Sequence, residues 1–344
     1  MTAAISDLKT RRADIAAKEP QLRARDLAAR LGISEAELVA LGHDGAETVR
    51  LKAEWPAIIA AVPALGRVMA LTRNEACVHE RKGVYGKLEG GAHVGLIVGE
   101  DIDLRIFFTQ WRFGFAVTEG ARRSLQFFDA EGTAIHKIYL TDTSDVAAFD
   151  RLVAGFAAEP APLAIEKKPA PRAALADSAV DVAAFHKAWD ALKDTHEFHG
   201  LLGKFKLQRV QALRLAGERR ARPVPLSALR ATLGFAGERG TPIMVFVGNP
   251  GMIQIHTGTV TNLKPMGPWF NVLDESFNLH LREDMIASAW IVWKPTEDGT
   301  VTSLELFDAA GETIATLFGK RKPGQPEDEA WRAIVADLIE KRAA

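Results

Sequence analysis

The pattern of apolar and polar positions predicts many short strands and few helices. Alternation of apolar with polar residues, or a short apolar run, is typical of a strand. Such stretches are HVGLIVG (93–99), DLRIFF (103–108), IMVFVG (243–248), MIQIHTG (252–258), FNLHLRE (277–283) and ASAWIVW (287–293). Helical spacing occurs over 24–41, 53–62 and 181–202. Because hairpins outnumber strand–helix–strand alternations, the pattern favours an α+β fold with antiparallel sheets.

One hairpin motif occurs twice in the sequence. The stretch SLQFFDAEG, which starts at Ser124, returns as SLELFDAAG from Ser303, 179 residues later, with six of nine positions identical. Each copy ends in an Asp-Ala-x-Gly turn, and each is followed by a second apolar strand and then by a helical stretch, 145–156 or 328–341. Two tandem structural repeats are therefore expected, each a large antiparallel sheet flanked by helices. A chance similarity between two hairpins is the alternative, because turn residues recur for local reasons.

A compositional break separates the two copies. Prolines and alanines interrupt the apolar periodicity in AAEPAPLAIEKKPAPRAALADSAV (157–180), as in a linker. We expect an N-terminal repeat over 1–158, a linker over 159–178 and a C-terminal repeat over 179–344.

The stretch that opens the second repeat carries two imidazoles at helical spacing. Apolar positions in 181–202 recur in steps of three and four and continue to His196 and His199. The sequence predicts one helix that starts at Asp177 or Ser178 and ends near Gly200 or Gly203. Both histidines would then lie on its buried side, in the last turn.

Three interpretations of this pair stay open on spacing alone. Both histidines are hydrogen-bonded core residues, or they chelate a divalent metal, or one is the axial ligand of a large apolar cofactor such as haem. Chelation usually needs i, i+4 spacing or further ligands nearby, and Glu197 points to another helix face.

Composition restricts the class of protein. The chain of 344 residues has a formal net charge of −1, with 25% charged and 47% hydrophobic residues, so no global charge attracts nucleic acid or anionic lipid. The one cysteine, Cys77, cannot form an internal disulfide, and the N-terminus lacks the apolar core of a signal peptide. No apolar run reaches about 18 residues. We expect a reduced, cytoplasmic protein without membrane insertion.

Several long motifs resemble a known family. DTHEFHGLL, IMVFVGNPGMIQIHTG, MGPWFNVLDESFNLHLRE, IASAWIVWKPTEDGTVTSLELFD, TRNEACVHERKGVYG and IDLRIFFTQW together are similar to the cytoplasmic haemin-degrading and haemin-transport proteins of bacterial haem uptake. The likeness runs from about Ala24 to the end in the same order and spacing. It implies a duplicated fold that binds one haem b in a cleft between the two halves.

The resemblance also implies roles for individual residues. His196 falls on the proximal iron ligand and His199 on an alternative ligand, so that His196 is the expected metal-binding residue. Arg105 falls on a distal arginine with a candidate catalytic role. Arg209 and Lys294 fall on positions of propionate or haem-edge contact, and Phe246 falls on an aromatic beside the macrocycle. Phe318 stands where some members have a tyrosine, so one hydroxyl contact to a propionate is missing. Without the resemblance, Arg105 reads as a sheet arginine paired with Asp103.

The expected function is haem binding after import, followed by transfer of the haem or by its oxidative degradation with an external electron donor. One alternative is a non-enzymatic chaperone that delivers haem to a separate haem oxygenase. Another is a haem-responsive regulator that binds DNA through the helix-turn-helix pattern of 24–41, although acidic residues dilute any basic face there. A haem importer, a reductase or a haem oxygenase are the implied partners, and nucleic acid is not expected.

Overall fold

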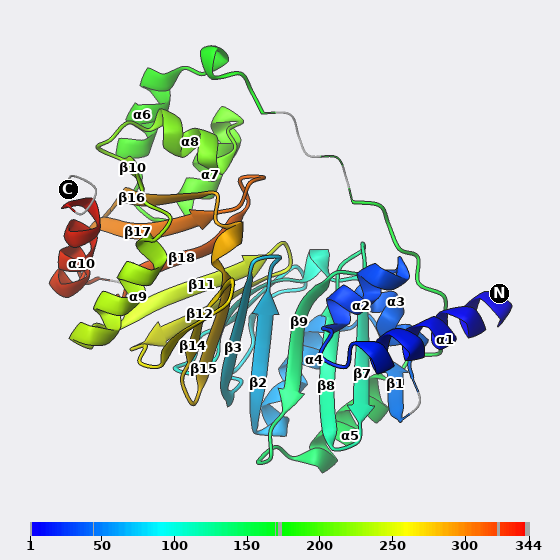
Figure 1. Cartoon of the computed structure of the whole chain (residues 1–344). Helices are drawn as coiled ribbons and strands as arrows, with labels where there is room; N and C mark the ends of the chain where they lie inside the picture. The colour runs from blue at the N-terminus through cyan, green and yellow to red at the C-terminus, as the bar shows by residue number, and fades with distance from the viewer. Residues whose placement is uncertain (1, 44, 169, 171–173, 322–323, 341–344) are drawn as a thin grey trace. The chain divides into compact units, whose positions relative to one another are not determined.

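The structure, a computed structural model, describes residues 2–43, 45–168, 170, 174–321 and 324–340. It comprises two compact units (Figure 1). The first contains Met1–Arg73, Glu80–Pro169 and Asn249–Gln254, and the second contains Asn74–His79, Ala170–Gly248 and Ile255–Ala344. Each unit therefore includes a short segment from the other half of the sequence. Residues 169 and 171–173 of the predicted linker, and residue 341 at the end of the last predicted helix, lie outside the described residues.

The first unit holds an antiparallel sheet in the order β1-β7-β8-β9-β2, and a smaller one in the order β4-β5-β6. The strands are β1 Ala46–Arg50, β2 Arg67–Arg73, β4 Glu89–Gly90, β5 Val94–Ile97, β6 Asp103–Phe107, β7 Phe113–Glu119, β8 Arg122–Phe128 and β9 Ala134–Leu140. The helices are α1 Thr2–Lys18, α2 Ala24–Leu31, α3 Glu35–Leu41, α4 Trp55–Ala61 and α5 Val146–Phe156, with 3-10 turns at Val62–Leu65 and Phe108–Gln110.

The second unit repeats this plan, with a sheet in the order β10-β16-β17-β18-β11 and a smaller one in the order β13-β14-β15. The strands are β10 Ala221–Val224, β11 Ile243–Asn249, β13 Leu263–Met266, β14 Trp269–Leu273, β15 Phe277–Arg282, β16 Ser288–Thr296, β17 Gly299–Phe307 and β18 Thr313–Gly319. The helices are α6 Val182–Asp190, α7 Glu197–Phe205, α8 Arg209–Leu215, α9 Ala228–Arg239 and α10 Glu329–Glu340, with 3-10 turns at Asp177–Ala179 and Glu283–Met285. Two further strands, β3 Cys77–Val84 and β12 Met252–Gly258, contribute residues to both units.

The structure confirms the expected α+β class and the internal repeat. The β8–β9 hairpin carries a bulge between Phe127 and Phe128, and the β17–β18 hairpin carries one between Leu306 and Phe307, at the same offset as the sequence repeat. In both turns the glycine has a positive φ, 75° at Gly132 and 80° at Gly311. Because such a backbone favours glycine, the Asp-Ala-x-Gly motif is a conformational requirement of both turns.

Helices cover both faces of each large sheet. In the second unit, α9 and α10 pack on the face that carries Ile291 and Leu304. The opposite face, which carries Val292 and Phe307, is covered by α6–α8 (Figure 1). In the first unit, α4 and α5 cover one face and α3 covers the other. Two-sided burial explains why several strands are continuous apolar runs instead of alternating ones.

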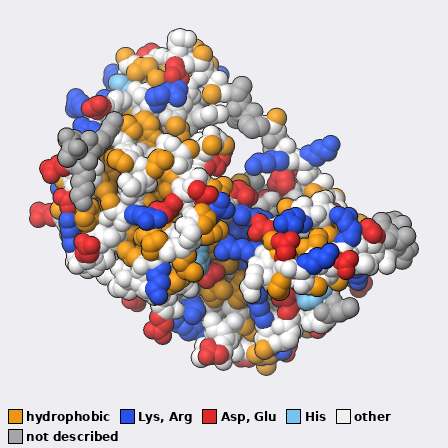
Figure 2. All heavy atoms as spheres, viewed as in Figure 1, with side chains coloured by type: hydrophobic (Ala, Val, Ile, Leu, Met, Phe, Trp, Pro, Cys, Tyr) orange, Lys and Arg blue, Asp and Glu red, His pale blue; other side chains and the backbone are white. Residues whose placement is uncertain are grey.

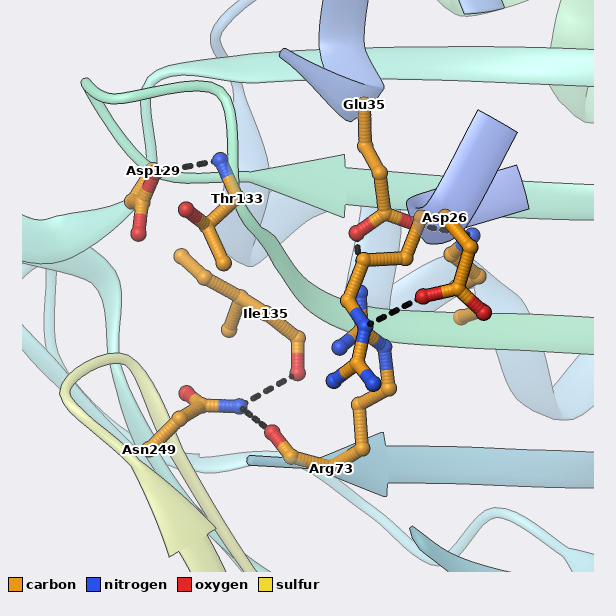
Figure 3. A network of polar contacts seen from close by, with 9 residues as sticks. Asp26, Glu35, Arg73, Asp129, Thr133, Ile135 and Asn249 are labelled. Atoms are coloured by element: carbon orange, nitrogen blue, oxygen red, sulfur yellow. Dashed lines mark hydrogen bonds and ion pairs between the residues drawn. The ribbon is translucent and has the colours of Figure 1, made fainter. Parts of the chain in front are cut away.

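A buried carboxylate holds α3 on the first sheet. Glu35, the first residue of α3, is 6% exposed and forms ion pairs with Arg73 of β2 and Lys137 of β9 (Figure 3). Burial alone would raise the pKa of Glu35, but the charges of Lys137 and Arg73 outweigh this effect and lower it. Glu35 therefore stays ionised, and removal of one partner would leave a buried charge unpaired.

An asparagine anchors each segment that comes from the other half of the sequence. In the first unit, Asn249 Nδ2 donates to the carbonyl oxygens of Arg73 and Ile135, at 2.9 and 2.8 Å (Figure 3). In the second unit, Asn74 Nδ2 donates in the same way to Gly248 and Ile314, at 3.1 and 2.8 Å. These hydrogen bonds give an acceptor role to backbone carbonyl groups at the ends of the strand pairing.

The surface is that of a mixed-charge protein. Basic and acidic side chains are interspersed over the face shown in Figure 2, as the net charge of −1 leads one to expect. Among the described residues, no helix has both the length and the apolar character needed to cross a bilayer.

A buried histidine predicts how stability depends on pH. His136 Nδ1 lies 2.8 Å from Thr72 Oγ1, and Nε2 lies 2.6 Å from the Tyr85 hydroxyl. Burial lowers the pKa of His136 to about 3, against about 6.5 for a histidine in an unfolded chain. Between these values the unfolded chain binds a proton that the folded protein does not, so the free energy of unfolding should decrease as pH falls, by up to about 1.4 kcal/mol per pH unit.

The matched variant is His136→Gln, which does not titrate and can still donate and accept hydrogen bonds. Urea denaturation between about pH 7 and about pH 4 should show a shallower decline for this variant than for the parent protein. Equal slopes would show that His136 does not control acid lability.

Candidate functional site

The helix expected over 177–203 is divided in the structure, and this prediction was wrong. The first part, α6, begins at Val182 after Asp181, whose side chain accepts from the Ala184 amide, and it ends at Asp190. The second part, α7, begins at Glu197, with His196 at its N-cap. His196 and His199 therefore lie in the first turn of a separate helix instead of the last turn of a long one.

The cause of the break is a local turn around Asp194. The Asp194 carboxylate accepts from the backbone amide of His196 at 2.8 Å, and Glu197 Oε2 accepts from the amide of Lys193 at 2.8 Å. Short acidic side chains that bond nearby amides compete with helical hydrogen bonds and favour a helix start. The break resets the helical register, so Phe198 occupies the buried position and both histidines are exposed. The expectation that the imidazoles face the core was therefore wrong.

The His196 imidazole is oriented by Asp194. Nδ1 lies 2.6 Å from Asp194 Oδ1, and the His196 side chain is 85% exposed. The hydrogen bonds from the His196 amide and imidazole lower the pKa of Asp194 despite an opposing effect of burial. Because an ionised carboxylate only accepts, Nδ1 carries the proton and Nε2 of the neutral ring presents its lone pair to solvent. A histidine held in this way is a preset metal ligand.

The exposed face of α7 is flat. His199, Gly200 and Gly203 follow His196 at helical positions i+3, i+4 and i+7, and all three are exposed. A Cβ atom added at Gly200 or Gly203 would have no heavy atom within 4 Å, so the space beside both is open. Glycine inside a helix is unfavourable by about 1 kcal/mol relative to alanine. Two glycines on one face give a planar ligand close access to the backbone.

The opposite face of α7 rests on a buried charge cluster. Glu305 of β17 is fully buried, with Lys294 Nζ at 2.6 Å and Arg209 Nε at 2.8 Å. Burial alone would raise the pKa of Glu305, but the charges of Arg209 and Lys294 hold it below its usual range. Both cations also lie over the Phe198 ring of α7, with Arg209 Cζ at 5.3 Å and Lys294 Nζ at 4.7 Å from its centroid.

This cluster decides where two of the predicted site residues lie. Lys294 is 3% exposed and Arg209 is partly exposed, and each is bonded to the same carboxylate. The Arg209 side chain is 30% exposed, whereas the Lys294 side chain is 3% exposed. Their predicted contact with propionates stays a prediction.

The aromatic residues Phe246 and Phe318 pack together beside the cluster. Their ring centroids are 5.1 Å apart in an edge-to-face arrangement, and both side chains are half-buried. In the register of the sheet, Phe246 pairs with Thr316 and Thr316 with Glu305, so these residues share one face. It is the face that α6–α8 cover in part. Phe246 therefore lies on the same sheet surface as the Glu305 cluster, where an apolar ligand would find partly exposed rings.

Arg105 belongs to β6 in the first unit. Its guanidinium forms an ion pair with Asp103, two residues away on the same strand, and its side chain is 31% exposed. Burial raises the pKa of Asp103, although Arg105 opposes this effect. The structure thus shows the pairing that the sequence offers as the ordinary role of Arg105. Its distal catalytic role and the haem cleft between the halves stay predictions.

Sequence reasoning missed Asp194 and Glu305. The position of Asp194 two residues before His196 was the sequence feature that could have indicated a helix start and a hydrogen bond to the imidazole. Glu305 lies in the repeated hairpin, where the first repeat has Gln126. No group of three or more His, Cys, Asp or Glu side chains that could hold a metal ion occurs within the part of the chain that the structure describes. The exposed imidazole is thus suited to a metal that brings most of its own ligands, as the iron of haem does.

Comparison with known proteins identifies the family of the chain. A sequence model of the haemin-degrading HemS.ChuX domain matches residues 32–156 and again residues 206–338. Hemin transport protein HmuS of Yersinia pestis is 42% identical over 335 residues, which cover 95% of this chain and 96% of the relative.

Two solved structures match over almost the whole chain. Holo-PhuS, described as a heme-binding protein from Pseudomonas aeruginosa, is 50% identical with a TM-score of 0.94, covering 97% of this chain and 99% of that one. The heme degrading enzyme ChuS of Escherichia coli O157:H7 is 38% identical with a TM-score of 0.90, at the same coverage. Two matches of one domain and full-length likeness lead to one conclusion: this chain belongs to the haemin-degrading HemS.ChuX family.

Proposed function

We propose that this protein binds one haem b through His196 and serves haem utilisation in the cytoplasm, where it carries the haem and opens its ring with an external electron donor. The observation that carries the proposal is the exposed His196 imidazole, whose Nδ1 is bonded to Asp194 so that Nε2 is the nitrogen free to bind a metal, beside an open, glycine-containing helix face. Family membership and the likeness to the heme-binding protein PhuS support haem as the ligand.

The residues of the second unit supply binding and orientation. His196 donates an electron pair to the iron, and Asp194 fixes the tautomer and the ring direction. Phe246 supplies an aromatic wall, and the exposed part of Arg209 supplies a donor for a propionate. His199, one turn along the same face, is the alternative ligand. Haem itself brings the redox-active iron, and the protein sets its position and its access to water.

Arg105 is the candidate for the distal, catalytic residue. An arginine is always protonated, so it cannot bind iron but can hold a water molecule and stabilise negative charge that develops on an oxidant. His196 belongs to the second repeat and Arg105 to the first. A reductase is the partner class that this chemistry requires.

The regulator alternative finds little support in the described residues. The helix pair α2–α3 exists, but α3 contains two glutamates and no basic residue. Glu35 is buried in ion pairs, and Ala36 packs on the first sheet. A recognition helix needs basic or polar side chains that reach the bases.

The first prediction concerns the iron ligand. His196→Ala should change the ferric absorption spectrum and weaken haem binding, because the axial nitrogen is lost, whereas His199→Ala should leave the spectrum unchanged. Asp194→Asn should weaken binding by about tenfold, the lower end for a residue that orients a metal ligand, since its hydrogen bond is exposed. Absorbance titration with haemin measures all three variants. An unchanged spectrum for His196→Ala, with a changed one for His199→Ala, would reassign the ligand.

The second prediction concerns the flat helix face. Gly200→Leu should stabilise the helical conformation of α7 by up to about 1 kcal/mol. It should nevertheless weaken haem binding, because the leucine side chain fills the open space beside His196. The matched control is Gly155→Leu in α5, which is likewise exposed with open space around it. Both variants should unfold no earlier than the parent, and Gly200→Leu alone should lose haem affinity. Equal affinity of the two would show that the ligand does not approach this face.

The third prediction separates catalysis from transport. Arg105→Leu should keep haem affinity but slow the loss of the haem absorption band under ascorbate, with catalase present, by a factor on the order of 10². If the parent protein leaves haem intact and passes it to a haem oxygenase, the chaperone function replaces the degradative one.

A further inference from the structure

A cavity of about 460 Å³ opens at the edge of the second sheet, in the second unit. Its walls come from the end of α6, from the loop that leads into β10, and from the β16–β17 hairpin. Three arginines, Arg219, Arg220 and Arg222, line it together with the indole of Trp293. None of these four residues belongs to the proposed haem site. Cavities of about 300–1,000 Å³ are the usual size for small-molecule ligands.

Two of the three arginines have unused donors. Arg220 forms two bonds of 2.7 and 2.6 Å to Asp190, and its positive charge is matched there. Arg222 lies 3.7 Å from an exposed carboxylate of Glu218, and its buried Nε has no hydrogen-bond partner among the described residues. Arg219 is exposed and forms no ion pair within 4 Å in the described ranges, although its charge helps to lower the pKa of Asp190. Nε of Arg222 is closed to solvent, so a ligand would meet the exposed Arg219 side chain and the exposed 34% of the Arg222 side chain. These positive charges favour a ligand that brings anionic oxygen atoms.

Hydrogen bonds to the backbone hold the walls of the cavity in position. The amide of Trp293 donates to the carbonyl of Arg220 at 2.8 Å, which ties the aromatic wall to the arginine loop. The Trp189 indole donates to the Trp293 carbonyl at 2.9 Å from the other side. Arg220 also donates to the carbonyl of Ala216 at 3.0 Å. Binding there would need little ordering of the protein, because the groups already have their positions.

We propose that this cavity binds a phosphate-bearing planar heteroaromatic ligand, of the nucleotide class. Arg219 and Arg222 supply forked donors that match phosphate oxygens. The half-buried Trp293 offers a ring face on which a base or an isoalloxazine stacks. An adjoining, mainly apolar hollow of about 430 Å³ also touches Trp293 and gives room for the far end of a longer ligand.

This inference is independent of the proposed function. The three arginines of the cavity have no recorded contact with His196, Glu305, Arg209 or Lys294, so a protein that failed to bind haem could still bind a nucleotide, and the reverse.

The test is a titration of the full-length protein with each of four probes: AMP, flavin mononucleotide, riboflavin and inorganic phosphate. Calorimetry and tryptophan fluorescence measure the binding of each probe. At least one phosphorylated heteroaromatic probe should bind at least about tenfold more tightly than riboflavin or inorganic phosphate, since only it offers both the ring and the anion. AMP binding points to an adenine nucleotide, and flavin mononucleotide binding points to a flavin. Failure of both at millimolar concentration overturns the proposal, and so does equal binding of inorganic phosphate.

Variants locate the site. The double variant Arg219→Gln, Arg222→Gln should lose at least about tenfold in nucleotide affinity and keep its haem affinity. Arg214→Gln, an exposed arginine of α8 that pairs with Asp177 away from the cavity, is the matched control and should bind as the parent does. Unchanged nucleotide affinity in the double variant would place the binding elsewhere and overturn the assignment.

Discussion

The candidate site depends on one buried carboxylate. Glu305 lies in the middle of a sheet strand with no access to water, and it remains charged only because Arg209 and Lys294 both reach it. The same two cations lie over Phe198, which packs α7 on the unit together with Leu201 and Leu202. The position of α7, and hence the outward direction of His196 and His199, follows from this arrangement. The buried charges of Glu305, Arg209 and Lys294, which are costly to desolvate, thus form part of the surface on which α7 packs.

The two repeats differ at that position in an informative way. Gln126 occupies in the first repeat the place that Glu305 has in the second, and both side chains bond the serine two residues earlier, at 3.1 and 3.0 Å. Gln126 donates to Ser124, whereas Glu305 accepts from Ser303. A neutral amide needs no cation, so the first repeat can use its own buried carboxylate, Glu35, to attach α3 instead. The two repeats thus share the hairpin but bury a carboxylate at different positions.

The sequence predicted most of the fold because its signals are local. Strand alternation and the repeated turn depend on near neighbours, and the structure has the hairpins and the repeat where they were expected. The helix break at 191–196 was missed because the apolar spacing runs on through it, while the Asp194 turn that interrupts the helix gives only a short-range signal. The exposure of His196 and His199 followed from that break. The pairing of Lys294 with Glu305 was missed because the two residues are not direct partners in the β16–β17 hairpin, where Lys294 pairs with Val301 and Glu305 with Trp290.

The two short segments that belong to the unit of the other half of the sequence limit how the chain can be divided. Asn74–His79 completes the second unit and Asn249–Gln254 completes the first, each fastened by an asparagine side chain. Neither half of the gene therefore encodes all the residues of one compact body. A cut between the two halves of the sequence would therefore remove from each body the segment that its asparagine fastens.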